Sequence, residues 1–87
     1  MDKLTICNAG NTQAPALAVL TQMGYAVYAA DAETSLVVAE NTEHRLLAED
    51  LVTLLGLATL AKIRGPEWSA TDQEIDDLLT LKLASGD

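Results

Sequence analysis

The chain contains little cysteine, few aromatic residues and few basic residues, and each shortage excludes something. A single cysteine, Cys7, cannot form a disulfide within the chain, which favours a reducing cytoplasm. Phenylalanine is absent and only three residues are aromatic, so a core must be built mainly from Leu, Val and Ala. Five Lys and Arg residues stand against thirteen Asp and Glu residues, giving a formal net charge of −8. This balance argues against direct binding of nucleic acid or of an anionic membrane surface, because both need Lys and Arg contacts.

Long apolar runs are also missing. The longest one, residues 51–61, includes two threonines and is shorter than the roughly 20 residues that a membrane-spanning helix needs. Residues 1–5 lack the positive charge followed by an apolar run that marks a secretory signal. The chain has 87 residues, 49% of them apolar, with no repeat, linker or low-complexity tract. We therefore expect one small cytoplasmic domain over residues 1–87.

The first half of the sequence predicts strands around one helix. That helix begins after a turn over residues 8–12, with Asn11 or Thr12 as its cap, and ends at Gly24. Apolar and β-branched runs separated by polar turns predict strands on either side of it. The expected strands are residues 4–7, 25–30 and 35–40, with a shorter additional one at 44–48. The polar turn at 31–34 is short, so the strands that it joins should form a hairpin.

A long apolar helix comes next and has clear ends. Asp50 is expected to cap a helix over residues 51–64, and Gly65 followed by Pro66 should end it. Almost no polar face interrupts this helix, so it should be the central buried helix of the domain. Gly56 in its middle lowers helix stability, which suggests close contact with a neighbouring backbone.

A capping box predicts the last helix. Thr71 and Glu74 have the spacing at which each side chain binds the other residue's amide, and a helix should follow to about Ala84. The inner stripe of this helix is expected to be Ile75, Leu78, Leu79 and one of Lys82 or Leu83. Together these elements predict an α+β fold in the order βαββ(β)αα. A small sheet of three or four strands would pack against the long apolar helix, with two further helices alongside.

Cys7 raises the possibility of a phosphate-handling site. It follows the first expected strand and precedes the 8–12 loop, where backbone amides and a helix N-terminus could hold an anion. A tyrosine-phosphatase-like loop needs an arginine at the position that Gln13 occupies, and the loop lacks the Lys and Ser or Thr of a P-loop. A small enzyme or phosphocarrier using Cys7 is thus the alternative, and a small buried apolar side chain is the simpler interpretation.

Two other side chains allow more than one interpretation. His44, the only histidine, could act as a general base near Glu43 or Glu49, but an exposed strand or turn histidine is the simpler interpretation. One histidine and one cysteine far apart in the sequence do not make a metal site, and no cofactor is indicated. Trp68 should either pack the corner between the last two helices or anchor an interface.

The excess of acidic residues indicates the function that we prefer. If the carboxylates gather in one continuous negative field, they would steer a basic protein partner onto the surface. The candidates are Asp72, Glu74, Asp76 and Asp77 on the last helix, with Asp31, Glu33, Glu40 and Glu43 beside the strands. A solvated face and helix-dipole preference are the alternative explanation for the first four. We expect a non-catalytic acidic protein-binding module, such as an inhibitor or immunity-type protein. A homo-oligomer formed through strand edges or the Leu-rich helix is a third alternative.

Several stretches resemble a small bacterial family of uncharacterised α+β proteins. The resemblance rests on residues 10–16, 23–27, 48–50 leading into 54–57, and 64–68 with 71–72 and 74–75. These motifs are turns, helix ends and caps, and they extend over most of the chain. The resemblance implies the α+β fold and a bacterial cytoplasmic or phage-related origin, and it carries over no catalytic residue.

Overall fold

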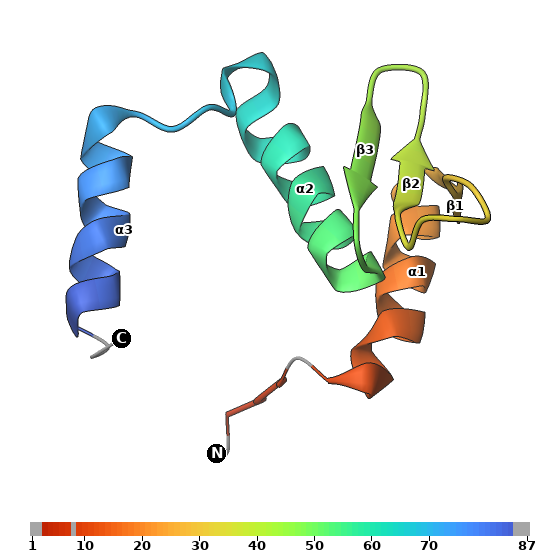
Figure 1. The fold of residues 1–87 in the computed structure, drawn as a ribbon, viewed down its shortest axis with the longest axis horizontal. Coiled ribbons are helices and arrows are strands. Elements are labelled where there is room, and N and C mark those ends of the chain that lie inside the picture. The colour runs from red at the N-terminus through yellow and green to blue at the C-terminus, as the bar shows by residue number, and fades with distance from the viewer. Residues whose placement is uncertain (1–2, 8, 85–87) are drawn as a thin grey trace.

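The computed structural model describes residues 3–7 and 9–84, with side chains up to residue 82 (Figure 1). The helices are α1 (Gln13–Gln22), α2 (Leu51–Arg64) and α3 (Asp72–Ala84), and the strands are β1 (Ala26–Ala29), β2 (Val37–Glu40) and β3 (Arg45–Ala48). Short 3-10 turns, η1 (Gly10–Thr12) and η2 (Gly65–Glu67), precede α1 and follow α2. The strands form one antiparallel sheet in the order β1-β2-β3. The predicted α+β class is confirmed, including the hairpin and the strand at 44–48.

The strand expected at residues 4–7 is not formed. This segment has no regular structure, and Leu4 and Ile6 are 87% and 74% exposed. No described strand pairs with it, and an isolated strand leaves its backbone groups unpaired and gains no burial. The prediction of a strand here is therefore wrong, and Cys7, expected to be a small buried side chain, is exposed.

The predicted ends of α2 and the predicted start of α3 are confirmed. The Asp50 carboxylate accepts the Thr53 amide at 2.7 Å, and Gly65 ends α2 with a φ of +61°. The Thr71 amide donates to Glu74 Oε1 at 2.8 Å, and the Glu74 amide donates to Thr71 Oγ1 at 3.2 Å. These bonds satisfy amides that a helix leaves without an internal partner. Local sequence signals therefore set these boundaries.

The start of α1 differs from the expectation. The Thr12 hydroxyl donates to the Ala9 carbonyl at 2.6 Å and makes no capping bond to an α1 amide. The Gln13 side-chain oxygen instead accepts the Leu51 amide at 2.9 Å, which ties the first residue of α1 to the first residue of α2. Gly24 follows α1 with a φ of +96°, as predicted for a left-handed stop.

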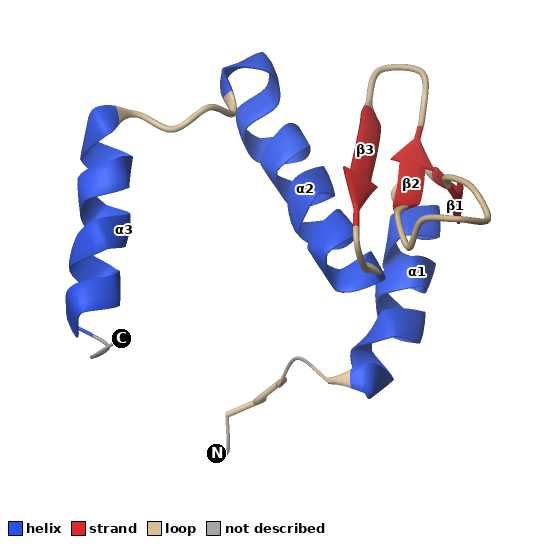
Figure 2. Cartoon of the chain, viewed as in Figure 1, coloured by secondary structure: helices blue, strands red, loops and turns tan. Residues whose placement is uncertain are grey.

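The core lies between one face of the sheet and the helix pair. α1 and α2 pack on each other and on this face, whereas α3 lies apart from it (Figure 2). The buried core residues are Leu20, Tyr25, Ala39, Ala48, Leu54 and Ala58. Val38, which pairs across to Tyr28 and Leu47, points to the opposite face and is also fully buried. β2 therefore has fully buried side chains on both of its faces.

Only one side of α2 is buried, so the expectation of a central buried helix is wrong. Leu54 and Ala58 are 0% exposed, whereas Leu60 is 41% and Ile63 is 76% exposed. A Cβ atom added at Gly56 would meet no atom within 4 Å apart from its neighbours in α2, so the predicted close contact with another backbone is absent among the described residues. The physical reason is size: three short strands and α1 cover only one side of α2.

α3 stands away from the rest of the molecule (Figure 1). Its predicted inner stripe, Ile75, Leu78 and Leu79, is 46%, 50% and 54% exposed, and we call these three residues the α3 stripe. Leu83, an alternative member of that stripe, lies outside the described side chains. Trp68 is 60% exposed and does not pack a buried helix corner as expected. The stripe is apolar and has the right spacing, but nothing in the described part of the chain buries it.

Candidate functional site

An ion pair holds the start of α3 beside the end of α2. Arg64 Nη1 donates to Glu74 Oε2 at 2.6 Å, and Arg64 Nη2 donates to Glu74 Oε1 at 3.0 Å. Arg64 Nη2 also donates to the Ser69 carbonyl at 3.1 Å, which fixes the connecting segment. The guanidinium, and then the Thr71 amide, lower the pKa of Glu74 to about 2, and the pair raises the pKa of Arg64. Both carboxylate oxygens of Glu74 are therefore engaged in bonds within the chain.

The other three acidic candidates on α3 are exposed. Asp72 and Asp76 lie one turn apart along the side of the helix next to the α3 stripe. Asp77 lies toward the opposite side, and its Oδ1 accepts a hydrogen bond from the side-chain Nε2 of Gln73 at 2.9 Å. Asp72 and Asp76 are thus the carboxylates that border the exposed apolar stripe.

Some of the acidic candidates beside the strands already form hydrogen bonds within the chain. Asp31 Oδ1 accepts the amides of Glu33 and Thr34, each at 2.8 Å, and the Thr34 bond is the main cause that lowers the pKa of Asp31. Glu40 Oε1 accepts the Tyr28 hydroxyl at 2.7 Å. The two remaining candidates of this group, Glu33 and Glu43, are exposed.

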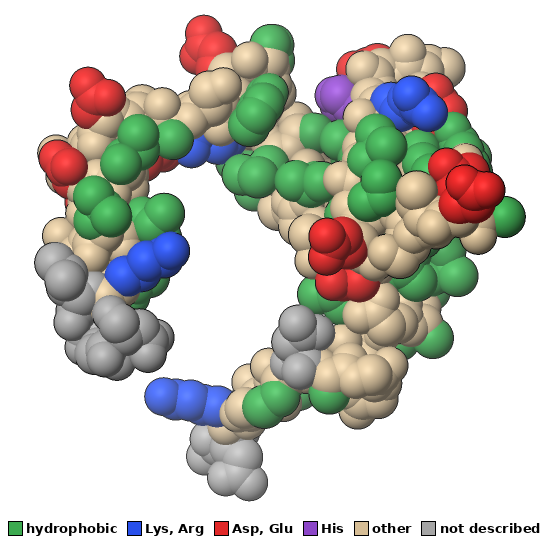
Figure 3. Space-filling view, in the orientation of Figure 1, with side chains coloured by type: hydrophobic (Ala, Val, Ile, Leu, Met, Phe, Trp, Pro, Cys, Tyr) green, Lys and Arg blue, Asp and Glu red, His purple; other side chains and the backbone are tan. Residues whose placement is uncertain are grey.

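The carboxylates fall into separate groups on the face that Figure 3 shows, with apolar side chains between them. One group follows α3, and others lie near the turns of the sheet. A basic residue also sits within the α3 group, because Arg64 is bound to Glu74. The single continuous field expected from the sequence is therefore not what this face presents.

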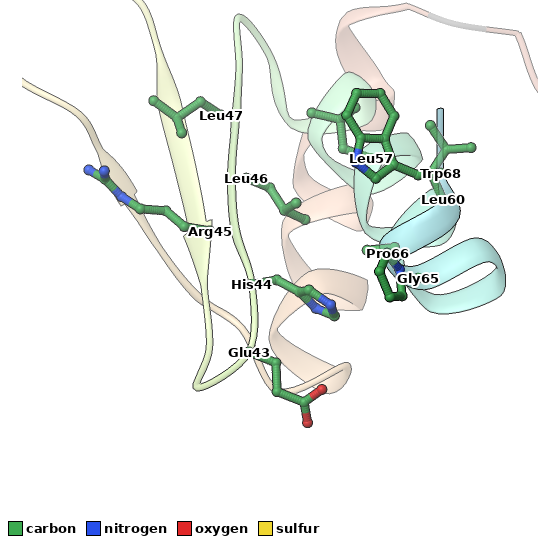
Figure 4. A pocket seen from close by; sticks show the side chains of 11 residues that line it. Glu43, His44, Arg45, Leu46, Leu47, Leu57, Leu60, Gly65, Pro66 and Trp68 are labelled. Atoms are coloured by element: carbon green, nitrogen blue, oxygen red, sulfur yellow. The ribbon is translucent and has the colours of Figure 1, made fainter. Parts of the chain in front are cut away.

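An apolar cavity of about 660 Å³ opens between β3 and the second half of α2 (Figure 4). His44 and Leu46 point from the β3 side toward α2, and Leu57, Leu60 and Trp68 lie opposite them. Arg45 and Leu47 point to the other side of the strand. We call this cavity the β3 groove, defined by His44, Leu46, Leu57, Leu60, Pro66 and Trp68.

His44 connects the β3 groove to the core. It is half-buried, its Nδ1 lies 3.3 Å from the Tyr25 hydroxyl, and the two ring centroids are 6.5 Å apart. The expectation of an exposed strand or turn histidine is wrong, because His44 is half-buried against Tyr25. This packing partner is 19 residues away in sequence, so no local pattern indicated it. The histidine thus lines the groove and packs on a core tyrosine.

The elements of the phosphate-site alternative do not converge on the groove. Cys7 is exposed in the N-terminal segment and does not line the groove, and Gly10–Thr12 form η1. Asn8, also part of that alternative, lies outside the described residues. Within residues 3–7 and 9–84, no group of three or more His, Cys, Asp or Glu side chains is placed to hold a metal ion. No described helix is both long and apolar enough to cross a membrane.

Sequence reasoning missed the β3 groove. Its walls come from within residues 43–47, 57–61 and 65–68, three separate stretches of the sequence. The available signal was the excess of apolar side chains near the end of α2, followed by Trp68. That excess predicts a buried core, but one small sheet is too small to cover it.

The chain was compared with family models, curated proteins and solved structures, and none of them matches. The bacterial family resemblance therefore stays a prediction.

Proposed function

We propose that the protein is a non-catalytic acidic binding module that presents α3 to a basic protein partner, as an inhibitor or immunity-type protein would. The observation that supports this most is the exposure of the α3 stripe, at 46%, 50% and 54% for Ile75, Leu78 and Leu79. Apolar side chains with helical spacing that stay exposed side by side are typical of a helix that binds a partner's groove. The bacterial cytoplasm is the setting that we propose for this encounter.

Electrostatics would orient the encounter. Asp72 and Asp76 border the α3 stripe, so they would face Lys or Arg side chains at the rim of the partner's groove. The net charge of −8 adds a long-range attraction to any positively charged protein. Complementary charge raises the association rate more than the final affinity, whereas burial of the stripe slows dissociation.

Binding kinetics of the full chain test this proposal, with a basic protein co-purified from the native host as the probe. Leu79→Ser should weaken binding about tenfold or more, since it removes one buried apolar side chain from the interface. Ile63→Ser is its matched control, because Ile63 is 76% exposed on α2 and lies outside the stripe.

Charge variants separate the two acidic groups. Asp76→Asn should slow association at low salt, whereas Glu33→Gln, which changes a strand-side carboxylate, should leave the rate nearly unchanged. The association rate of the unmodified chain should fall as salt rises, because ions screen exposed charges. An association rate that does not vary with salt, or equal losses in L79S and I63S, would contradict the proposal.

A further inference from the structure

β3 carries unpaired backbone groups along its outer edge. The Asn41 amide donates to the His44 carbonyl at 3.0 Å, and Leu46 pairs across to Ala39, so His44 and Leu46 direct their backbone groups toward β2. In an antiparallel pair these directions alternate. The N–H and C=O groups of Arg45 and Leu47 therefore point away from the sheet, where no described strand pairs with them. Such an edge is a template for another strand.

The β3 groove specifies which strand would fit. A strand added beside β3 would place alternate side chains toward α2, against Leu57, Leu60 and Trp68. The side chains between them would lie on the other face, beside Arg45 and Leu47. The groove therefore selects a segment in which apolar, polar and apolar residues alternate.

The N-terminal segment has this pattern and makes no hydrogen bond to the rest of the described chain. Leu4, Thr5 and Ile6 alternate, and Leu4 and Ile6 are 87% and 74% exposed. No hydrogen bond joins residues 3–7 to another residue that the structure describes. Lys3 adds charge complementarity, because the exposed carboxylates of Glu43 and Glu49 lie at the two ends of β3.

We propose that residues 3–7 of one copy add as a fourth strand to the β3 edge of a second copy, with Leu4 and Ile6 filling the β3 groove. The exchange is reciprocal, so each chain donates one strand and receives one, and the dimer is closed. The direction of the segment favours a second copy. It leaves α1 at the end of the molecule away from the β2–β3 turn, and it would have to reverse to reach its own groove (Figure 1).

Salt distinguishes this dimer from binding to a basic partner. Two copies with a net charge of −8 repel each other, and ions screen that repulsion. Self-association through β3 should therefore strengthen as salt rises, whereas association with a basic protein should weaken. The two proposals can fail independently.

Sedimentation velocity of the full chain over a range of concentrations, at low and high salt, is the first test. A concentration-dependent dimer is expected, and Ile6→Ser should weaken it about tenfold or more because each dimer loses two buried side chains. Ile63→Ser is the matched control, since Ile63 is 76% and Ile6 is 74% exposed. Leu79→Ser is the control for pairing through the α3 stripe.

Residue-resolved amide exchange is the second test. The Arg45 and Leu47 amides should exchange more slowly as the dimer forms, and Ile6→Ser should abolish that protection. The proposal is overturned if the chain stays monomeric at all concentrations. This holds even if the Arg45 and Leu47 amides exchange slowly, because their protection would then arise within the monomer. It is equally overturned if Leu79→Ser or Ile63→Ser dissociates the dimer as strongly as Ile6→Ser.

Discussion

Arg64 and Glu74 form a two-pronged ion pair, with N–O distances of 2.6 and 3.0 Å, that joins the last residue of α2 to the first turn of α3. The same carboxylate accepts the Thr71 amide and so closes the capping box of α3. One side chain therefore both starts the helix and connects it to α2. Because the α3 stripe makes no extensive contact with another described element, this junction sets where the stripe lies.

The junction should weaken in acid. The pKa of Glu74 is lowered from 4.5 to about 2, chiefly by the Arg64 hydrogen bonds. A carboxyl group whose pKa is lower in the folded state contributes stability that is complete above its unfolded pKa and is lost as pH falls through the folded value. The stabilising effect should therefore decline between pH 4.5 and about 2. Carboxyl chemical shifts followed against pH measure the pKa directly.

Glu74→Gln supplies the control for this pH dependence. The amide keeps the shape of the side chain but cannot form the charged pair, so α3 amides should exchange faster and the acid-dependent step should disappear. Asp76→Asn, on the same helix but outside the junction, should keep that step. An ordinary pKa for Glu74 would show that the ion pair does not persist in solution.

The contrast between local and distant signals explains what the sequence could predict. The Asp50 cap and the Thr71–Glu74 box depend on residues three apart, so composition and spacing sufficed. The Gln13–Leu51 bond and the Tyr25–His44 contact join residues 38 and 19 positions apart, and nothing local encodes them. Residues 4–7 have the composition of a strand but do not form one. A strand also needs an edge to pair with, and composition cannot provide it.

The prediction of which side chains are buried failed for a related reason. An apolar stripe shows only which side chains gain from leaving water, not whether the chain has enough surface to cover them. The α3 stripe and the outer side of α2 have the pattern of core and stay exposed because the sheet is small. The candidate binding surfaces of this protein therefore lie where the apolar pattern predicted a core and the structure leaves the side chains exposed.

Gly56 and Gly24 should respond oppositely to alanine. Gly56 lies inside α2 with open space around it, so Gly56→Ala should stabilise the protein by about 1 kcal/mol. Gly24 has a φ of +96°, which disfavours any side chain, so Gly24→Ala should destabilise it by about 1–2 kcal/mol. Urea unfolding of both variants checks the signs. A destabilising Gly56→Ala would mean that a backbone does approach α2 in solution.

Leu54 should carry more stability than any exposed leucine of the same helix. It is 0% exposed within the core, so Leu54→Ala should cost about 2–5 kcal/mol through lost burial and the cavity left behind. Leu60 is 41% exposed on the wall of the β3 groove, so Leu60→Ala should cost about 1 kcal/mol or less in the monomer. The free energies of unfolding of the two variants should be measured at a concentration where the chain is monomeric. Equal losses would indicate that the groove is filled within one chain.

Trp68 should report directly on occupancy of the β3 groove. It is the only tryptophan, it is 60% exposed, and it lines the groove beside Leu57 and Leu60. Its fluorescence should therefore be quenched readily by acrylamide in dilute solution, because water and small solutes reach the ring. Strand exchange places Ile6 of a second copy against the ring, so quenching should fall and the emission should shift to shorter wavelength as concentration rises.

Ile6→Ser should keep Trp68 accessible at every concentration, whereas the control Ile63→Ser should behave like the unmodified chain. Emission that is short-wavelength and insensitive to concentration would mean that the indole is already buried within the monomer. That outcome would remove the open groove on which the exchange depends, and it would leave the exposed α3 stripe as the surface available to a partner.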